Sequence, residues 1–361
     1  MRILNEFTYA AENNDCLISH SISGNISSKL GLIKFINNKK VTSIQPFQFP
    51  EVTLFINEAS IIFPNILITK NNDLINTNNG FTSVELIDHN ISDYPMIKKE
   101  NNILIKKPKN EIEITKGVYL LAANNFSAFL LGEIPRLEKY KDFISKGYPI
   151  ILHGECLPFH MELLNLFEIA SDQIIKVPGN KLIIANQLIH ATPTFFHNSV
   201  SYNAIRYLRS RLLAHINENN NKKYDKVYFS RSKLGLKSDR LIENEKDIEL
   251  ILEKNNFVIM YPEKLKVIDQ LQVFNSANIL ISPFGATWAN LVLRKNNAKS
   301  LILATKFSPE FATISHFLDQ ELFAMQLTPK KVKEGKNFSQ SHNFYVTEKE
   351  KKIIKNFISL L

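Results

Sequence analysis

The stretch that decides the fold is NILISPFGATWAN, residues 278–290. An apolar run at residues 279–281 stops at Ser282-Pro283, a Gly-Ala pair follows, and an amphipathic segment begins near Thr287. A strand, a glycine turn and a helix in this order are typical of a parallel sheet that presents backbone N–H groups to a phosphate. Ordinary strand-to-helix loops can have the same pattern, so the neighbouring sequence has to decide.

The sequence around this stretch alternates between strand-like and helix-like segments. After a polar break at residues 217–225, short apolar runs alternate with amphipathic segments of helical period. Strands are expected at residues 226–231, 257–262, 278–284 and 299–305, and helices at 243–256, 266–277 and 286–296. This alternation predicts a parallel, Rossmann-like sheet.

The sequence before residue 219 predicts a first domain of a different kind. Short β-branched runs such as EVTLFI and ASIIFPNILIT, separated by Asn-rich turns, fill its opening part. Strands and helices then alternate, including a helix broken near Pro135. The expected domains are residues 1–218 (β-rich 1–117, α/β 118–199, linker helix 200–218), the Rossmann-like residues 219–345, and a C-terminal helix at 346–361.

Composition narrows the class of protein. A chain of 361 residues with 44% hydrophobic and 22% charged residues is typical of a soluble globular protein with room for two domains. Cys16 and Cys156 are too few for a disulfide scaffold or a zinc ribbon, which favours a reduced, cytoplasmic protein. No apolar run is long enough for a signal core or a membrane span. The net charge of +9 favours a polyanionic partner or serves solubility alone.

The ends of the predicted strands in the second domain carry groups that suit a nucleoside diphosphate. Ligands of open parallel sheets bind beyond the carboxyl ends of the strands. Those ends supply the cation of Arg231, the carboxylate of Glu263 and the Gly285-Ala286 turn. An arginine fork and helix N-terminal amides are the groups that bind phosphate. The alternatives are a surface ion pair for Arg231 and a simple tight turn at Gly285.

Other ligand classes have less support. No Walker motif and no G-x-G-x-x-G follows a predicted strand, which disfavours an ATPase or a simple dehydrogenase. In HGECLPFH, residues 153–160, His153-x-Glu155 is similar to a zinc deaminase motif, but the P-C-x-x-C that such a site needs is absent. We therefore expect no metal site, and His153 and His160 to be partly buried or to line a cleft. Nucleic-acid binding would rest on net charge alone.

The second domain carries a series of motifs in a recognisable order. They are Y-x-S-R, a spaced second Arg, N-E before a helix, P-E after a strand, a helix with Gln, and G-A-x-x-x-N. This series resembles glycosyltransferase family 61. The matching residues are Ser230, Arg231, Arg240, Asn244, Glu245, Phe257, Pro262, Glu263, Gln270, Ala277, Gly285, Ala286 and Asn290. Upstream, NNFSAFLLGEIPRL at residues 124–137 is similar to the family's segment that ends in Pro-Arg-Leu.

The resemblance implies an α/β fold of the GT-B type, in which two Rossmann-like domains face a cleft. Here a β-rich N-terminal extension and a C-terminal helix packed across the junction would be added. It implies an inverting transfer without a metal ion or a cofactor. The second domain would hold the nucleotide-sugar donor, linked to UDP or CMP, through the matching motif residues Ser230, Arg231, Arg240, Asn244, Glu245, Glu263, Gln270, Gly285, Ala286 and Asn290, together with Phe284.

Three departures from the family pattern concern the chemistry. Phe284 stands where the family has His, and Ala128 and Gly132 stand where the upstream segment has His and then Asp or Glu. Phe284 would stack on the donor or fill the space of the histidine. The general base that takes the acceptor's proton would then be Glu133, Glu155 or His153. Glu133 lies one residue late and needs a local bulge, and an ion pair with Arg136 at i,i+3 is its alternative role.

The expected function is a hexosyl-, pentosyl- or N-acetylhexosaminyltransferase acting on a surface polysaccharide, such as a capsule or lipopolysaccharide, or on a lipid-linked glycan. The alternatives are a sugar-nucleotide epimerase of GT-B fold and a non-catalytic nucleotide- or glycan-binding relative. The basic helix at residues 347–361 would either contact an anionic membrane on its cytoplasmic side or pack back on the protein.

Overall fold

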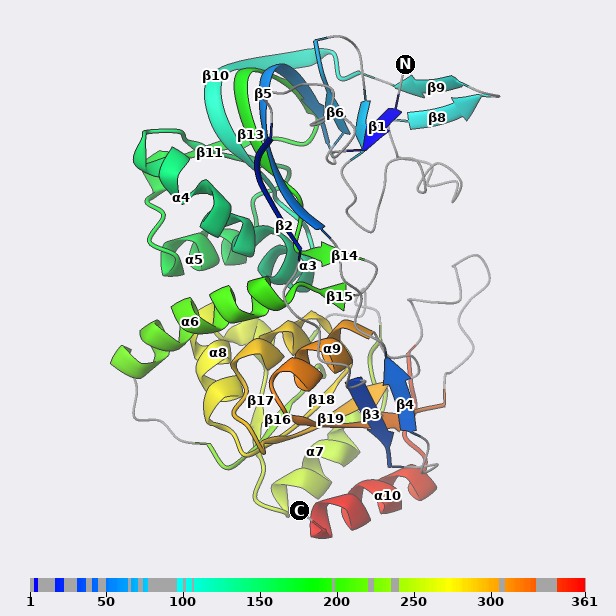
Figure 1. Cartoon of the computed structure of the whole chain (residues 1–361). Helices are drawn as coiled ribbons and strands as arrows, with labels where there is room; N and C mark the ends of the chain where they lie inside the picture. Colours follow the sequence, from blue (N-terminus) through cyan, green and yellow to red (C-terminus); the bar gives the residue numbers. More distant parts are fainter. Residues whose placement is uncertain are drawn as a thin grey trace. The chain divides into compact units, whose positions relative to one another are not determined.

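Figure 1 shows the computed structural model of the chain. The structure describes residues 3–5, 17–22, 31–36, 41–44, 50–63, 66–70, 74–76, 96–99, 102–105, 107–196, 199–219, 224–234, 240–304, 309–328 and 343–360. The chain divides into two compact units, Met1–Ile26 with Phe47–Leu208 and Ser27–Pro46 with Arg209–Leu361. The boundary between them falls within helix α6 (Tyr202–Asn219). Cys16 and Thr305 lie outside the described residues.

The second unit is built on one mainly parallel sheet. In the described part of the chain its strand order is β17-β16-β18-β19-β20-β3-β4, and all neighbours are parallel except the last pair. The bounds are β16 (Lys226–Phe229), β17 (Val258–Met260), β18 (Ile279–Pro283), β19 (Lys299–Ala304), β20 (Glu321–Gln326), β3 (Gly31–Phe35) and β4 (Val41–Ile44). The four strands predicted from the alternating pattern are present, and the expected α/β class is confirmed.

The connections of this sheet create a switch point. From β16 the chain passes through α7 (Glu245–Glu253) to β17 on one side of β16. From β17 it then returns through α8 (Val267–Ser276) to β18 on the other side of β16. Figure 1 shows α7 and α10 (Glu348–Ser359) on one face of the sheet, and α8 and α9 (Pro309–Phe317) on the other. In such doubly wound sheets, the crevice between the two strands where the order reverses is the usual ligand position. Here those strands are β16 and β18.

The segment after β18 is a helix of another type than the pattern suggested. It is the 3-10 helix η5 (Ala286–Leu293), and its residues from Trp288 onward are buried. The Trp288 indole N–H donates to the carbonyl of Pro283 at 3.1 Å, which ties the first turn of η5 to the end of β18. The short strand-to-helix turn is therefore held by a core side chain.

Residues 27–46 group with the second unit, although the sequence placed them in the first domain. Strand β3 pairs in parallel with β20, with Lys34 opposite Phe323. Lys34 also forms an ion pair with Glu321 at 3.1 Å. This pairing joins segments far apart in the chain, so local periodicity contains no sign of it.

The first unit contains a mixed sheet with the order β1-β7-β6-β5-β13-β10-β11-β12, and β2 pairs with β5. The strands β10 to β13 are parallel where they pair, and β5 runs antiparallel to β13. The bounds are β1 (Ile3–Asn5), β2 (Leu17–Ile22), β5 (Pro50–Ile62), β6 (Ile66–Ile68), β7 (Leu74–Asn76), β10 (Asn110–Leu121), β11 (Ile150–His153), β12 (Ile174–Val177) and β13 (Lys181–Ala191). Two small hairpins, β8 (Met96–Lys99) with β9 (Asn102–Ile105) and β14 (Phe195–Phe196) with β15 (Ser199–Val200), complete it.

The helix predicted to break near Pro135 breaks in two ways. After α3 (Phe126–Ala128) comes a π-helical turn, η1 (Phe129–Glu133), and then a 3-10 turn, η2 (Ile134–Arg136), before α4 (Leu137–Ser145). The backbone N–H of Ile134 donates to the carbonyl of Phe129, which is the wider π spacing. This is the local bulge that Glu133 was expected to need. Further helical segments of this unit are α5 (Pro158–Leu166), η3 (Ser171–Gln173) and the first part of α6.

The C-terminal helix α10 packs on the second unit. Ile354 and Ile358 are buried in its core, and the rings of Phe323 and Phe357 lie 5.0 Å apart. Lys351 forms an ion pair with Asp247 of α7 at 2.7 Å. A membrane contact through the apolar face of α10 would need these side chains to be exposed. No described helix has the length and apolar character needed to cross a bilayer.

Arg294 is a buried cation that donates hydrogen bonds to four backbone carbonyls of the second unit. Its guanidinium donates to the carbonyls of Phe274 and Ala277 at the end of α8, of Asn278 before β18, and of Lys299 at the start of β19. The last carbonyls of a helix carry partial negative charge, so a cation is favourable there. Burial lowers the pKa of Arg294 to about 9, and the group remains charged at neutral pH.

We predict that Arg294→Met lowers the free energy of unfolding by about 3 kcal/mol, because each buried acceptor left without a donor costs roughly 1–3 kcal/mol. Guanidinium unfolding followed by circular dichroism measures the change. Lys295→Met is the matched control, because Lys295 is the exposed neighbour. Equal midpoints for the two variants would contradict the role given to Arg294.

Candidate functional site

The switch point of the second unit brings an arginine against a glycine. Arg231 follows β16, and Gly285 follows β18. A Cβ atom at residue 285 would collide with Nη1 of Arg231. The φ of Gly285 is −176°, an extended value open to any residue, so the glycine is needed for this close approach and not for its backbone angle. The missing side chain is what lets the guanidinium lie along the backbone that opens η5.

The start of η5 offers further polar groups. The first N–H groups of a helix have no acceptor inside the helix, and here they follow Gly285 directly. On the same helix, Asn290 is fully buried, and neither atom of its amide has a hydrogen-bond partner among the described residues. A buried polar group without a partner is rare in native proteins and calls for a bound ligand or water.

A second arginine lies at the same edge of the sheet. The guanidinium carbon of Arg240 is 5.3 Å from the centre of the Phe284 ring, and that ring also contacts Phe311 at 5.6 Å. Arg240 has a φ of 64°, in the left-handed region that costs a non-glycine residue energy. The structure therefore holds Arg240 in a strained conformation against Phe284.

Two carboxylates of α7 hold the loop that carries Arg231. Glu245 Oε1 accepts from the backbone N–H of Arg231 at 2.9 Å and from the Tyr228 hydroxyl at 2.8 Å. Burial raises the pKa of Glu245, and these hydrogen bonds partly offset that rise. Its other oxygen, Oε2, is buried without a hydrogen-bond partner in the described ranges.

Glu249 completes the support of this loop. Its Oε1 accepts from the hydroxyls of Ser230 and Ser232, each at 2.7 Å. Burial would raise the pKa of Glu249, but the hydrogen bonds from Ser232 and Ser230 outweigh it and lower the pKa. The ionised carboxylate thus fixes the two serines on either side of Arg231.

The other residues expected at the donor site have mixed positions. Gln270 donates to the carbonyl of Pro262 at 3.0 Å and accepts from the Thr287 hydroxyl at 3.4 Å, so it links η4 (Pro262–Lys264) to η5. Asn244 instead exchanges two hydrogen bonds with the backbone of Val346 and anchors the C-terminal segment. Glu263 is exposed on η4, and Ala286 is half-buried at the start of η5.

In the first unit, the candidate bases gather at the carboxyl ends of β10 and β11. Leu121 ends β10 and lies opposite His153, the last residue of β11. The π turn places Glu133 at the same edge, where its Oε2 accepts from the backbone N–H of Leu121 at 3.0 Å. The same oxygen accepts from Arg136 at 2.5 Å. The expected i,i+3 ion pair therefore exists, but it is buried and not on a surface.

Arg136 continues a buried polar chain. Its Nη2 donates to the Tyr140 hydroxyl at 2.8 Å, and that hydroxyl donates to the carbonyl of Tyr119 and accepts from the N–H of Ala191. These bonds join α4 to the ends of β10 and β13. His190 stacks on Tyr119 with ring centres 5.8 Å apart. These hydrogen-bonded side chains support the carboxyl end of β10, where Glu133 lies.

His153 and Glu155 differ in their access to solvent. His153 is fully buried, and its Nδ1 lies 3.3 Å from the Tyr119 hydroxyl. Glu155 is exposed and follows Gly154, whose φ of 131° suits glycine. His160 is buried, accepts from the N–H of Leu157 through Nδ1 at 2.9 Å, and lies 2.9 Å from the Ala123 carbonyl through Nε2. Of the candidate bases Glu133, Glu155 and His153, Glu155 is the one whose side chain is exposed to solvent.

Several residues of these sites escaped the sequence interpretation. Three of them lie in strands whose sequence is mainly apolar: Tyr228, Tyr119 and His190. Nothing in the neighbouring sequence predicts that their hydroxyls or rings take part in these sites. Glu249 could have been found, because it lies four residues after Glu245 and so on the same helix face. Among the described residues, no group of three or more His, Cys, Asp or Glu side chains could hold a metal ion.

Comparison with known proteins identifies the family to which this geometry can be related. The family model described as Glycosyltransferase 61 matches residues 66–301, about two thirds of the chain. The match runs from β6 into β19 and includes both strand-end sites. No curated protein matches the chain.

The buried histidines predict acid sensitivity. Burial lowers the pKa of His153 to about 4 and lowers that of His160, and burial together with Arg136 lowers that of His190. In the unfolded chain a histidine pKa is ~6.5, so the unfolded state binds more protons below that pH. The stability contributed by the neutral rings is complete above ~pH 6.5 and falls toward pH 4.

We expect His153→Gln to reduce this loss by on the order of 3 kcal/mol between pH 7 and pH 4, since one pKa unit corresponds to ~1.4 kcal/mol. Urea unfolding at several pH values measures it. Parallel stability curves for the variant and the wild type would contradict a neutral, buried His153.

Proposed function

The chain belongs to glycosyltransferase family 61, and from this membership we propose that its second unit binds a nucleotide-sugar donor and its first unit presents the acceptor. The fold would be a GT-B arrangement of these two units, with residues 27–46 and helix α10 belonging to the second unit and not to separate domains as the sequence suggested. The observation that carries the donor assignment is Arg231 lying against Gly285 at the strand reversal between β16 and β18.

The groups at this position match the chemistry of a diphosphate. Arg231 and Arg240 supply positive charge, and the first N–H groups of η5 supply donors at the positive end of a helix. The buried amide of Asn290 and the Oε2 atom of Glu245 are further polar atoms without partners in the described residues, and the Glu245 oxygen can accept only from a donor such as a sugar hydroxyl. A UDP- or CMP-linked sugar would satisfy them. Ser230, Asn244 and Gln270 would act by fixing the surrounding loops.

The reaction would be an inverting displacement. The acceptor hydroxyl oxygen attacks the anomeric carbon, the bond from that carbon to the donor's phosphate oxygen breaks, and the hydroxyl proton passes to a base. The nucleotide leaves with its negative charge held by the two arginines. We propose that no metal ion takes part.

Glu155 is the base that the geometry favours. Its carboxylate is exposed at the carboxyl end of β11, whereas Glu133 is held in a buried ion pair and His153 is fully buried. A base has to come within ~3 Å of the acceptor hydroxyl, which requires access. Glu133 then acts as a support for the end of β10.

The acceptor would be a surface polysaccharide, such as a capsule or lipopolysaccharide, or a lipid-linked glycan, met at the cytoplasmic side of a membrane. Lys349, Lys352 and Lys355 are exposed on α10, opposite its buried apolar face. Each lysine near an anionic bilayer is worth about 1 kcal/mol, so this face would give a weak peripheral contact.

We predict that Arg231→Ala weakens binding of the preferred nucleotide by about 1.5–3 kcal/mol, the range for hydrogen bonds to charged groups. Arg240→Ala should act in the same direction. Calorimetric titration with UDP and CMP measures the affinity. Lys254→Ala, which removes an exposed charge after the end of α7, is the control. An unchanged dissociation constant in folded Arg231→Ala protein would remove the donor assignment.

We expect Glu155→Gln to lower turnover at saturating substrate by about 10²–10⁴-fold with donor affinity unchanged. Glu133→Gln should instead lower stability, because breaking a buried ion pair costs about 3–5 kcal/mol. Transfer assays over donor and acceptor panels, with a thermal melt of each variant, separate the two effects. Normal turnover by Glu155→Gln would exclude it as the base.

The same assays test the alternative functions of the protein. Nucleotide binding by the wild type without any turnover would favour a non-catalytic relative. Chemical alteration of the donor sugar when no acceptor is present would favour an epimerase.

A further inference from the structure

Strand β10 has an open edge over the first part of its length. It pairs with β13 from Asn110 to Val118, but with β11 only from Val118 to Leu121. On the β11 side, the residues before Val118 therefore have no strand partner in the described part of the chain. Figure 1 shows β10 and β13 running side by side well beyond the start of β11. An unpaired strand edge presents backbone N–H and C=O groups that another chain can bind.

The direction of these backbone groups follows from one hydrogen bond. The N–H of Val118 donates to the carbonyl of Pro149 at 3.0 Å, so Val118 turns its backbone toward β11. Alternate residues of a strand turn their N–H and C=O groups to the same edge. Ile112, Ile114 and Lys116 therefore direct these groups to the open edge, about 6.6 Å apart. An extended polypeptide chain has donors and acceptors at the same spacing.

A groove of about 350 Å³ lies along this open edge. Its apolar walls are Ile112 and Ile114 of β10, Pro149 before β11 and Ile175 of β12. When a peptide binds by adding a strand to a sheet, its backbone pairs with the edge and its alternate side chains enter pockets of this kind. The groove therefore provides the second of the two contacts that such binding needs.

The charged side chains that line the groove are Glu113 and Lys116. The Lys116 ammonium is engaged, since it donates to the Lys146 carbonyl at 3.3 Å and lies 4.6 Å from the centre of the Tyr148 ring. Glu113 is exposed and has no hydrogen bond or ion pair with another residue that the structure describes. The available charge of the groove is thus negative, which favours a partner strand that carries lysine or arginine.

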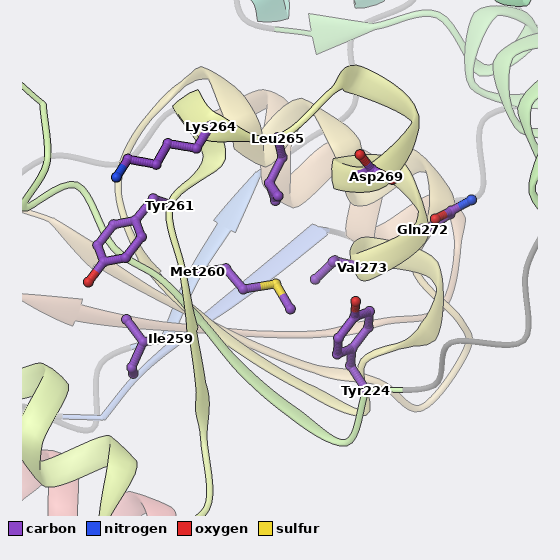
Figure 2. Close-up of a pocket in the computed structure, with 9 residues that line it drawn as sticks. All are labelled: Tyr224, Ile259, Met260, Tyr261, Lys264, Leu265, Asp269, Gln272 and Val273. Carbon is purple, nitrogen blue, oxygen red and sulfur yellow. The ribbon is translucent and has the colours of Figure 1, made fainter.

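The edge strand of the other sheet offers much less. A cavity of about 360 Å³ lies beside β17, where Met260 and Val273 point toward each other (Figure 2). The N–H of Ser230 donates to the Met260 carbonyl at 2.8 Å, so Met260 turns its backbone toward β16. In this three-residue strand only Ile259 then faces outward. An added strand would find one residue to pair with there, against three on β10.

A second copy of the chain fits the open edge of β10 poorly. Glu113 is the middle residue of the open stretch 110–116. Two copies paired antiparallel about that point would place their Glu113 side chains opposite each other. Like charges directly opposite destabilise a strand pair, and a basic segment does not meet this repulsion.

We propose that the open edge of β10 binds an extended, basic segment of a partner protein as an added β-strand. A lysine or arginine of that segment lies beside Glu113, and its apolar side chains enter the groove toward Pro149 and Ile175. The groove lies at the beginning of β10, away from the carboxyl ends of the strands that carry Glu133 and Glu155. Docking and transfer would use separate sites, so the proposal does not depend on the donor assignment.

The test measures peptide binding to the full-length protein by fluorescence polarisation. The probes are three labelled hexapeptides: one of alternating valine and lysine, one of alternating valine and glutamate, and the basic peptide with every backbone nitrogen methylated. Glu113→Lys reverses the charge of the groove. Glu138→Lys is the matched control, because Glu138 is exposed on α4 and does not line the groove. A thermal melt shows that each variant is folded.

We expect the wild type to bind the basic peptide about tenfold more tightly than the acidic or the methylated peptide, because strand pairing adds several hydrogen bonds. Glu113→Lys should reverse the preference between the basic and acidic peptides, and Glu138→Lys should leave it unchanged. Equal binding of the methylated peptide, binding of none of the peptides, or an unchanged preference in folded Glu113→Lys protein overturns the proposal. A dimer in sedimentation velocity that the basic peptide does not displace would place a second copy on the edge and overturn it as well.

Discussion

Arg231 lies against the backbone that opens η5, and its Nη1 atom occupies the space that a Cβ atom at residue 285 would need. This close approach depends on the reversal of strand order, which makes β16 and β18 neighbours although α7, β17, η4 and α8 separate them in the chain. Parallel neighbours end at the same edge of the sheet, so the residues after them meet there. The cation, the helix start and the aromatic ring of Phe284 all follow from that one pairing.

Both units use a buried carboxylate to hold the end of a strand. Glu245 accepts from the backbone N–H of Arg231 after β16, and Glu133 accepts from that of Leu121 at the end of β10. A tyrosine or an arginine hydrogen-bonds the same oxygen in each case. An N–H at a strand end has no ladder partner, and burying it unpaired would cost free energy. The two carboxylates therefore make rigid the edges from which the proposed chemistry would act.

The same logic explains why some charged residues are poor candidates for direct chemistry. Glu133 is close to the position expected from the family segment, but its accepting oxygen already holds two donors inside the protein. Glu155 has no such duty in its exposed position after Gly154. A residue that supports a strand end must stay ordered, whereas a proton acceptor must reach the substrate. In the proposed mechanism the two roles fall to Glu133, which supports the end of β10, and to Glu155, which follows the neighbouring strand β11.

The sequence by itself determined the elements whose signal is local. The alternation of apolar runs and amphipathic segments after residue 225 predicted β16 to β19 with α7 and α8, because burial on one face or on both gives a period that can be read directly. Arg231 and Gly285 could be named for the same reason, since spacing along the chain places them at strand ends, whereas Asn290, inside η5, was named only through the family resemblance.

Only the tertiary structure decided what depends on distant partners. The pairing of β3 with β20, the burial of the Glu133–Arg136 pair and the packing of the apolar face of α10 involve contacts whose free energy is set by segments far away in the chain. A basic amphipathic helix such as α10 has the same sequence pattern whether it covers a protein core or contacts a bilayer. The sequence around Glu133 likewise does not distinguish an exposed carboxylate from one in a buried ion pair. The choice between such outcomes lies in which side chains surround the residue, and that is a property of the folded chain.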